Sequence, residues 1–200
     1  MSRDRADAPR AVIFDLDGTL TEPLLDFDAM RAEIGLRPGL PILEQLAEGD
    51  DGLRARGEVV LRRHERDAIA RATLSDGCLE LLALLRARDL PAAILTRNTH
   101  DAVDDFVRKF DFGASFAARY TREDGPPKPD PEGVLRLCRA LGVAPADTLV
   151  VGDFKFDVLA GRNAGCRTAL VTAEQIDDLC DWGSPDYVVR SLRELLSLWR

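Results

Sequence analysis

Two aspartates end an apolar run near the start of the chain, in the stretch AVIFDLDGTLTEP at residues 11–23. In an extended strand, residues i and i+2 point to the same side, so Asp15 and Asp17 should face one site while Leu16 points into the core. Gly18 permits a turn with positive φ that aims backbone N–H groups at the same place. Because two close carboxylates repel each other, the pair predicts a bound cation or a shared proton.

Other reactive residue types follow later apolar runs. Asp153 ends one such run in VVGDFKFD (150–157), and Asp157 lies one helical turn further along if a helix begins nearby. Thr96 follows the apolar run PAAIL, and Lys128 lies in the loop sequence PPKPDP. The carboxyl ends of parallel strands meet at one edge of a sheet, so these side chains are expected to gather there with Asp15.

The combined chemistry suits a phosphoryl group and a metal ion. Aspartate oxygens form a hard ligand set that Mg²⁺ prefers. A threonine hydroxyl, a lysine ammonium and loop N–H groups suit the remaining phosphoryl oxygens. Taken singly, Asp15 and Asp17 could cap a solvated turn, Thr96 could be a turn residue and Lys128 an exposed loop charge. Their order and shared position at strand ends are what favour a site.

Four motifs, FDLDGTL, ILTRN, PPKPDP and VVGDFKFD, occur in this order between residues 11 and 157. In motif content and order the chain resembles the haloacid dehalogenase superfamily. Within it, the chain is similar to the phosphatase-like members with a small helical cap of the C1 type, such as phosphoglycolate phosphatase-like proteins. The resemblance implies a Mg²⁺-dependent phosphatase that hydrolyses a small-molecule phosphomonoester through an aspartyl-phosphate.

The resemblance also implies roles for single residues. Asp15 would be the nucleophile that takes the phosphoryl group. Asp17 would protonate the leaving alkoxide and later activate water, although a free aspartate titrates near pH ~3.9, so its pKa would have to be raised. Thr96 and Lys128 would hold and neutralise the phosphoryl group, and Asn98 would help to bind it.

The metal set implied by the resemblance is the Asp15 side chain, the Asp17 backbone carbonyl and the Asp153 side chain. Asp157 would lie beside these ligands without binding the metal itself. One departure from the family pattern is Phe154, where many relatives have a small hydroxyl residue. That departure concerns the surroundings of the metal ligands and not the ligands.

The elements that must position these residues form an α/β pattern: a Rossmann-like parallel sheet with helices on both faces. Residues 24–88 contain no convincing strand and predict a small all-helical cap inserted after the first strand. We expect a core of residues 1–20 and 75–200 and a cap of residues 21–74. The predicted strands are 11–15, 91–96, 115–120, 147–153, 167–172 and an edge strand at 186–189. The predicted helices are 26–35, 41–49, 53–72, 78–88, 98–110 (with Asn98 as N-cap), 131–142, 156–165 and 191–200.

Composition excludes several classes of partner. A net charge of -8 argues against nucleic acid as the main partner, because phosphate backbones are bound mainly by excess Lys and Arg. No apolar run is long enough for a membrane span or a signal peptide. The four cysteines, without CxxC spacing, are interpreted as reduced and mostly buried thiols, which favours a cytoplasmic protein. The sequence does not indicate an oligomeric state.

Other reactions of the superfamily fit less well. Dehalogenases lack an acid at the position of Asp17, phosphonate-cleaving members need a cap lysine that residues 21–88 do not contain, and pumps need membrane helices. A sugar phosphomutase retains both aspartates and stays open as the main alternative, although the short insert weakly favours hydrolysis. From another class, a receiver-like or catalytically idle phosphate- or metal-binding module also stays open.

The expected partner is a small phosphorylated metabolite, and the insert offers polar residues that could contact it. A charge run on a long helix is more often a solvated face, so these residues are weak candidates, and neither His64 nor His100 is given a role. The candidates are Asp26, Arg31, Glu44, Arg62, Arg63, His64 and Arg66.

Overall fold

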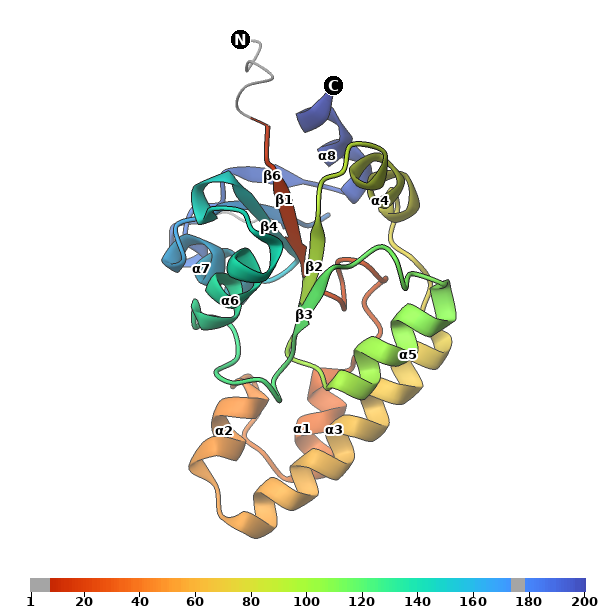
Figure 1. Cartoon of the computed structure of the whole chain (residues 1–200). Helices are drawn as coiled ribbons and strands as arrows, with labels where there is room; N and C mark the ends of the chain where they lie inside the picture. Colours follow the sequence, from red (N-terminus) through yellow and green to blue (C-terminus); the bar gives the residue numbers. More distant parts are fainter. Residues whose placement is uncertain (1–7, 174–178) are drawn as a thin grey trace.

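A sheet of parallel strands forms the centre of the protein in the computed structural model, which describes residues 8–173 and 179–200 (Figure 1). The six strands run in the order β3-β2-β1-β4-β5-β6. The predicted strands are confirmed, including the edge position of the last one. They are β1 (Ala11–Phe14), β2 (Ala92–Leu95), β3 (Ala118–Tyr120), β4 (Thr148–Gly152), β5 (Arg167–Val171) and β6 (Tyr187–Val189).

The strand order reverses direction beside β1, which lies between β2 and β4. Phe14 of β1 is paired with Val151 of β4, and the backbone N–H of Asp15 donates to the carbonyl of Val151 at 2.9 Å. Open α/β sheets form a crevice beyond the carboxyl ends of the strands at such a reversal. The residues that follow β1 and β4 therefore emerge side by side at this crevice.

Helices cover both faces of the sheet, as predicted (Figure 1). Alternating residues of β1 face opposite sides, so Val12 and Phe14 pack in one apolar cluster and Ile13 in another. The first face is covered by α4 (Cys78–Ala87), α5 (His100–Phe110) and α8 (Leu192–Leu195), and the second by α6 (Glu132–Leu141) and α7 (Lys155–Asn163). The predicted helix at 191–200 is shorter than expected, because a 3₁₀ turn at Leu196–Trp199 follows α8.

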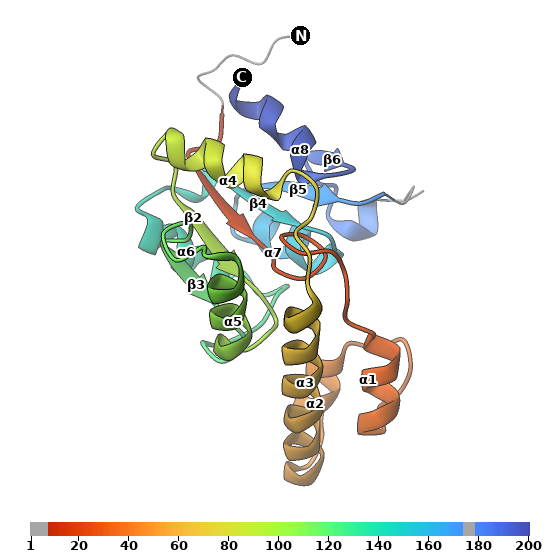
Figure 2. The same ribbon diagram turned by 90° about the vertical axis from the view of Figure 1, so that its right-hand side faces the viewer.

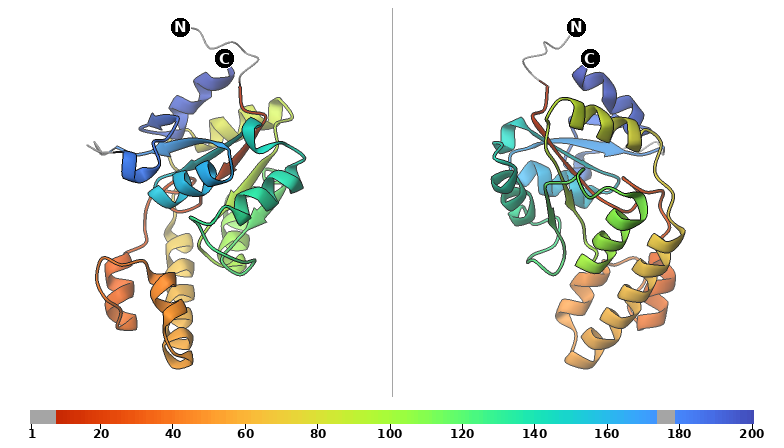
Figure 3. Two further views of the ribbon diagram at one scale, coloured as in Figure 1. Left: turned by 90° about the vertical axis from the view of Figure 1, so that its left-hand side faces the viewer. Right: turned by 45° about the vertical axis from the view of Figure 1, so that its right-hand side comes forward.

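Three helices precede α4 in the segment after β1: α1 (Phe27–Ile34), α2 (Ile42–Glu48) and α3 (Asp51–Arg71). They lie beyond one end of the sheet and share an apolar cluster that includes Met30, Ile42 and Leu61 (Figures 2 and 3). Gly57 lets α2 pack closely on α3, since a Cβ there would lie 2.5 Å from a methyl carbon of Leu46. The helical insert is confirmed, whereas the domain boundaries at residues 20 and 75 stay a prediction.

Polar contacts join α3 to the core along α5 and the loop after β3. The ammonium of Lys109 donates to the carbonyls of Ile69, Ala70 and Ala72 at 2.8–2.9 Å, where α3 ends. Glu65 of α3 is 2% exposed and forms an ion pair with Arg122. These contacts hold the long helix of the insert against the core.

The described residues include no helix that is long and apolar enough to cross a bilayer. Cys78, Cys138 and Cys166 are buried thiols, as expected for most of the cysteines, and Cys180 is exposed.

Candidate functional site

A buried lysine joins two of the predicted site carboxylates. The Lys128 ammonium lies 2.5 Å from Asp15 Oδ1, 2.5 Å from Asp157 Oδ1 and 3.0 Å from the carbonyl of Leu95. Its side chain is 3% exposed. Burial alone would lower the pKa of Lys128, but the charges of Asp15 and Asp157 outweigh it and raise the pKa, so the ammonium stays charged.

Asp17 lies in a different electrostatic environment from Asp15. Burial, with the nearby charge of Asp15, raises the pKa of Asp17 to about 7, and the hydrogen bond that it accepts from the Asn98 amide only partly opposes this. Near neutral pH Asp17 thus carries a proton for much of the time. Burial and the charge of Asp15 are therefore a physical cause for the raised pKa that the family resemblance implied for Asp17.

The prediction that Asn98 is the N-cap of its helix is wrong. Thr99 caps α5 instead, because its hydroxyl accepts from the N–H of Ala102 at 3.3 Å. Asn98 is 6% exposed and is directed at Asp17. Both residue types are good caps, and the hydrogen bond to Asp17 decides which one remains for the helix.

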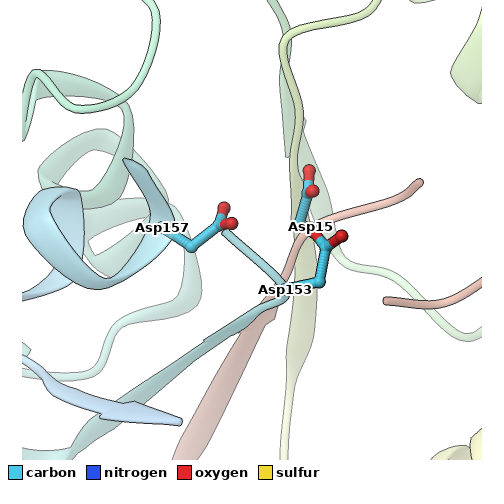
Figure 4. A group of neighbouring side chains, drawn as sticks. All are labelled: Asp15, Asp153 and Asp157. Carbon is cyan, nitrogen blue, oxygen red and sulfur yellow. The ribbon is translucent and has the colours of Figure 1, made fainter. Parts of the chain in front are cut away.

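Three carboxylates, those of Asp15, Asp153 and Asp157, offer oxygens that lie within 4.8 Å of one another (Figure 4). Burial and the charges of Asp15 and Asp157 raise the pKa of Asp153 to about 8. Burial also raises the pKa of Asp157 to about 6, against the opposing charge of Lys128. One ammonium against three carboxylates leaves an excess of negative charge that a divalent cation would relieve.

Two glycines make room for these carboxylates. A Cβ on Gly18, which has φ +77°, would lie 2.1 Å from Asp153 Oδ2. A Cβ on Gly152 would lie 2.0 Å from the carboxyl carbon of Asp157. Asp157 is held in turn by the N–H of Phe154, which donates to its Oδ2 at 3.1 Å. The cluster therefore depends on the absence of a side chain at both positions.

Thr96 directly follows β2 and is 3% exposed. Its hydroxyl accepts from the N–H of Asn98 at 3.2 Å, which fixes the turn after the strand. The buried hydroxyl of Thr19 has no hydrogen-bond partner among the described residues. Both hydroxyls lie in the two turns that also carry Asp17 and Asn98.

A cavity of about 470 Å³ opens over this edge of the sheet and is lined by both core and insert. Asp15, Asp17, Thr96, Asn98, Lys128, Asp153 and Asp157 all line it. The structure thus brings every predicted site residue to one cavity. The charged groups form its floor, and α1, α2 and α3 contribute a wall that is mostly apolar.

The sequence model described as haloacid dehalogenase-like hydrolase matches residues 41–171, which include Thr96, Lys128 and Asp153 but begin after Asp17. The N-acetylmuramic acid 6-phosphate phosphatase of Pseudomonas putida is 30% identical over 210 residues, covering 93% of this chain and 94% of that protein. The phosphoglycolate phosphatase of Chromobacterium violaceum is 30% identical over 216 residues, covering 96% of each. The chain belongs to the haloacid dehalogenase-like hydrolase family.

A solved structure supports the fold of this family member independently. The crystal structure of a hydrolase from Pseudomonas syringae matches with a TM-score of 0.80 at 22% identity, covering 94% of this chain and 96% of that one. The two relatives above are equally similar to the chain although their names give different substrates. Similarity at this level therefore assigns the family but not the substrate. The substrate of this hydrolase has to be inferred from its own cavity.

The polar insert residues that the sequence offered as substrate contacts mostly face elsewhere. Only Arg31 among them lines the cavity. Asp26 caps α1, and Glu44 forms an ion pair with Arg97. Arg63 and His64 bind Glu33, and Arg62 and Arg66 line a separate surface hollow on the α5 side. The charge run on α3 is therefore largely a structural and solvated face, as its composition favoured.

Among the cavity-lining residues that sequence reasoning missed are two charged ones, Arg97 and Glu65. Arg97 donates to the carbonyl of Lys128 and to Glu44 at 2.7 Å, so it links the site loop to α2. Glu65, from α3, accepts from the Thr99 hydroxyl at 3.1 Å, and burial raises its pKa. Glu65 is one of two glutamates in an arginine-rich helix, and nothing in the sequence distinguishes it from Glu58.

Proposed function

We propose that this hydrolase is a Mg²⁺-dependent phosphatase that cleaves a small phosphomonoester through an aspartyl-phosphate on Asp15. The observation that carries the proposal is that two neighbouring carboxylates have opposite electrostatic surroundings. Asp15 is paired with the Lys128 ammonium, whereas the pKa of Asp17 is raised to about 7 by burial and by Asp15. One carboxylate is thus available as an anion and the other as an acid.

In the first step, an Asp15 oxygen attacks the phosphorus and the bond from phosphorus to the ester oxygen breaks. The proton of Asp17 passes to the departing alkoxide, which leaves as an alcohol. In the second step, the Asp17 carboxylate takes a proton from water, the water oxygen attacks the phosphorus, and the bond from phosphorus to the Asp15 oxygen breaks. Inorganic phosphate leaves, and both aspartates return to their starting protonation states.

The phosphoryl group is anionic, so an anionic nucleophile needs positive charge beside it. Lys128 supplies this charge, since its ammonium already contacts Asp15 at 2.5 Å. The hydroxyl of Thr96, the Asn98 amide and the N–H groups of the turn after Asp15 are the donors proposed for the phosphoryl oxygens. Phosphoryl transfer depends mostly on such positioning and charge neutralisation.

The acidic cluster fits a magnesium ion. The side chains of Asp15 and Asp153 and the backbone carbonyl of Asp17 would hold it, with Asp157 orienting Lys128 and the loop beside it. Mg²⁺ would neutralise negative charge on the nucleophile and on the transferring phosphoryl group. The raised pKa of Asp153, about 8, supports this, because burial among like charges favours neutralisation by a cation.

The proposal is tested by phosphate release from an aryl phosphate and from a panel of phosphorylated metabolites. We expect turnover with Mg²⁺, no turnover after chelation, and none in Asp15→Asn. Asp17→Asn should impair substrates with poor leaving groups most, because only these need the proton.

Two outcomes would replace the proposal. Phosphate binding without turnover would favour an idle binding module. Transfer of labelled phosphate back to a sugar, rather than to water, would favour a phosphomutase.

A further inference from the structure

Exposed apolar side chains are concentrated around the cavity. Among the described residues, the exposed large apolar ones are Leu24, Phe27, Leu40, Val59, Leu79, Phe154 and Val188. Four of these seven, Leu24, Phe27, Leu40 and Phe154, line the cavity over the catalytic floor. Exposed apolar groups that gather in one hollow, and do not scatter over the surface, indicate a binding surface.

The aromatic part of this lining begins next to the metal cluster. Phe154 directly follows Asp153, and its ring packs edge-on against Phe156 at 5.0 Å and against Trp182 at 5.4 Å. These neighbours hold the Phe154 ring in place although the residue is 43% exposed. The group that meets this ring is therefore the part of the substrate next to the phosphate. In a phosphomonoester that part is the leaving group.

Two of the three cations in the cavity wall, Arg31 and Arg97, are already engaged in ion pairs. Arg31 donates to the Leu40 carbonyl at 2.8 Å and pairs with Asp28. Arg97 pairs with Glu44 and stacks over the Phe156 ring, 4.8 Å from its centroid. The third, Lys155, lies over apolar rings, with its ammonium 5.9 Å from the centroids of Phe154 and Phe156. A site that selects a sugar needs polar groups directed at its hydroxyls, because buried hydroxyls without partners are costly.

We propose that the substrate is a phosphomonoester whose leaving group is a compact apolar ring, an inference that rests on the proposed phosphatase activity. The ring contacts Phe154 and Phe156 at the start of α7 and Leu24, Phe27 and Leu40 from the insert. The phosphate lies on the floor at Asp15 and Lys128. The apolar wall thus selects the leaving group, because a polyhydroxylated group would leave most of its hydroxyls without partners there.

The test compares two phosphates of nearly equal shape: cyclohexylmethyl phosphate and glucose 6-phosphate. Both present a six-membered ring on a CH₂–O–phosphate, so they differ in hydroxyl groups and not in the bond that breaks. We expect kcat/KM to be at least about 100-fold higher for the cyclohexylmethyl ester, since a few unpaired hydroxyls and lost apolar contacts are worth this much. An equal value for both esters, or a higher value for the sugar, overturns the inference.

Two wall variants separate leaving-group contact from simple closure of the cavity. Leu24→Asn and Phe154→Ser should each lower kcat/KM for cyclohexylmethyl phosphate about tenfold and leave that for glucose 6-phosphate within about twofold. The matched control Leu79→Asn changes an exposed leucine on α4 that lies outside the cavity lining, and it should change neither value. An equal loss for both esters in the wall variants means that the wall only packs on itself, which overturns the inference.

Failure of this inference is distinct from failure of the proposed function. If phosphate is released from glucose 6-phosphate faster than from the apolar ester, the enzyme is a phosphatase with a different selectivity. If neither ester nor any aryl phosphate is hydrolysed with Mg²⁺ present, the phosphatase proposal fails, and the selectivity proposal fails with it.

Discussion

The floor and the wall of the cavity differ in how their side chains are satisfied. On the floor, Lys128 is 3% exposed and each of its contacts is to oxygen, at 2.5–3.0 Å. On the wall, Phe27 is 51% exposed and Leu40 40% exposed. Because buried charges are costly unless they are paired, the charged side chains of the floor are restricted to the arrangement that keeps them paired. Exposed apolar side chains have no such restriction on their geometry. They contribute favourable free energy only when another group covers them and removes their surface from water.

This difference indicates that the floor and the wall have separate roles. The floor is built from the turns at the ends of β1, β2 and β4, which the sheet holds in register, from the loop after β3 that carries Lys128, and from Asp157 of α7. The wall comes mostly from the insert, whose helices α1, α2 and α3 have their own apolar cluster, with Phe154 and Phe156 added at the start of α7. The proposed chemistry therefore belongs to the core, and the choice of leaving group belongs to the insert together with Phe154 and Phe156.

The largest expected effect comes from removing the proposed nucleophile. Asp15→Asn should lower kcat at least about 10⁴-fold for every phosphomonoester, because no other group can form the covalent intermediate. The measurement is steady-state phosphate release with Mg²⁺ present. Asp51→Asn, which changes a 99% exposed aspartate on α3, serves as control and should retain full activity. Substantial activity in Asp15→Asn would remove Asp15 from the mechanism.

Loss of the floor cation should damage both chemistry and stability. Lys128→Met leaves Asp15 and Asp157 without their shared partner, and we expect kcat to fall about 10³-fold. The free energy of unfolding should fall by about 3 kcal/mol, the size expected when one member of a buried ion pair is removed. Chemical denaturation and phosphate release measure the two effects. Lys109 lies outside the cavity lining, so Lys109→Met should leave kcat unchanged. Equal losses of kcat in the two variants would contradict the assignment of the chemistry to the cavity floor.

A buried ion pair away from the floor tests whether burial or mere charge decides stability. Arg122 and Glu65 have side chains 7% and 3% exposed, whereas Arg119 and Asp104 are 37% and 46% exposed. Arg122→Met should cost about 3 kcal/mol of unfolding free energy, and Arg119→Met less than about 1 kcal/mol. Denaturant unfolding of both variants gives the comparison. Similar losses of unfolding free energy in the two variants would show that burial of the ion pair between Arg122 and Glu65 contributes little to stability.

The smallest predicted effect is a pH dependence of the metal-free protein. The pKa values of Asp17 and Asp153 are raised to about 7 and about 8 by burial, above their usual value near 3.8. The folded chain therefore holds these protons more tightly than the unfolded chain, and stability falls as pH rises from about 4 to about 8.

Thermal unfolding without metal measures this slope. We expect a lower midpoint at pH 8 than at pH 6, with recovery on adding Mg²⁺. Asp153→Asn should flatten the slope, whereas Asp51→Asn should keep it. A midpoint that rises with pH in the metal-free protein would contradict the raised pKa values.

The sequence predicted the floor well because each floor residue follows a strand in a readable motif. Asp15, Thr96 and Asp153 each come directly after an apolar run, and a parallel sheet must bring such positions together. The strands themselves were found for the same reason. The start of α3 was placed two residues late, because GDDG indicated a break whereas Asp50 caps the helix through the N–H of Leu53.

The cavity wall and the contacts between α3 and the core could not be predicted in the same way. Leu24, Phe27 and Leu40 are ordinary apolar residues, and no local pattern says whether they pack inward or line a cavity. Glu65 lies within LRRHERD and was indistinguishable from its solvated neighbours, although it is 2% exposed. Its position depends on Arg122 and Thr99, which are distant in sequence, so only the tertiary structure identifies it.

The most direct measurement is an acid quench of the enzyme during turnover of an aryl phosphate with Mg²⁺, followed by peptide mass spectrometry. We predict a phosphoryl group on the peptide that contains Asp15, in larger amount in Asp17→Asn because water attack is then slow. Asp15→Asn should carry none. Rapid phosphate release from the wild-type enzyme with no phosphorylated peptide in either protein would contradict the aspartyl-phosphate mechanism.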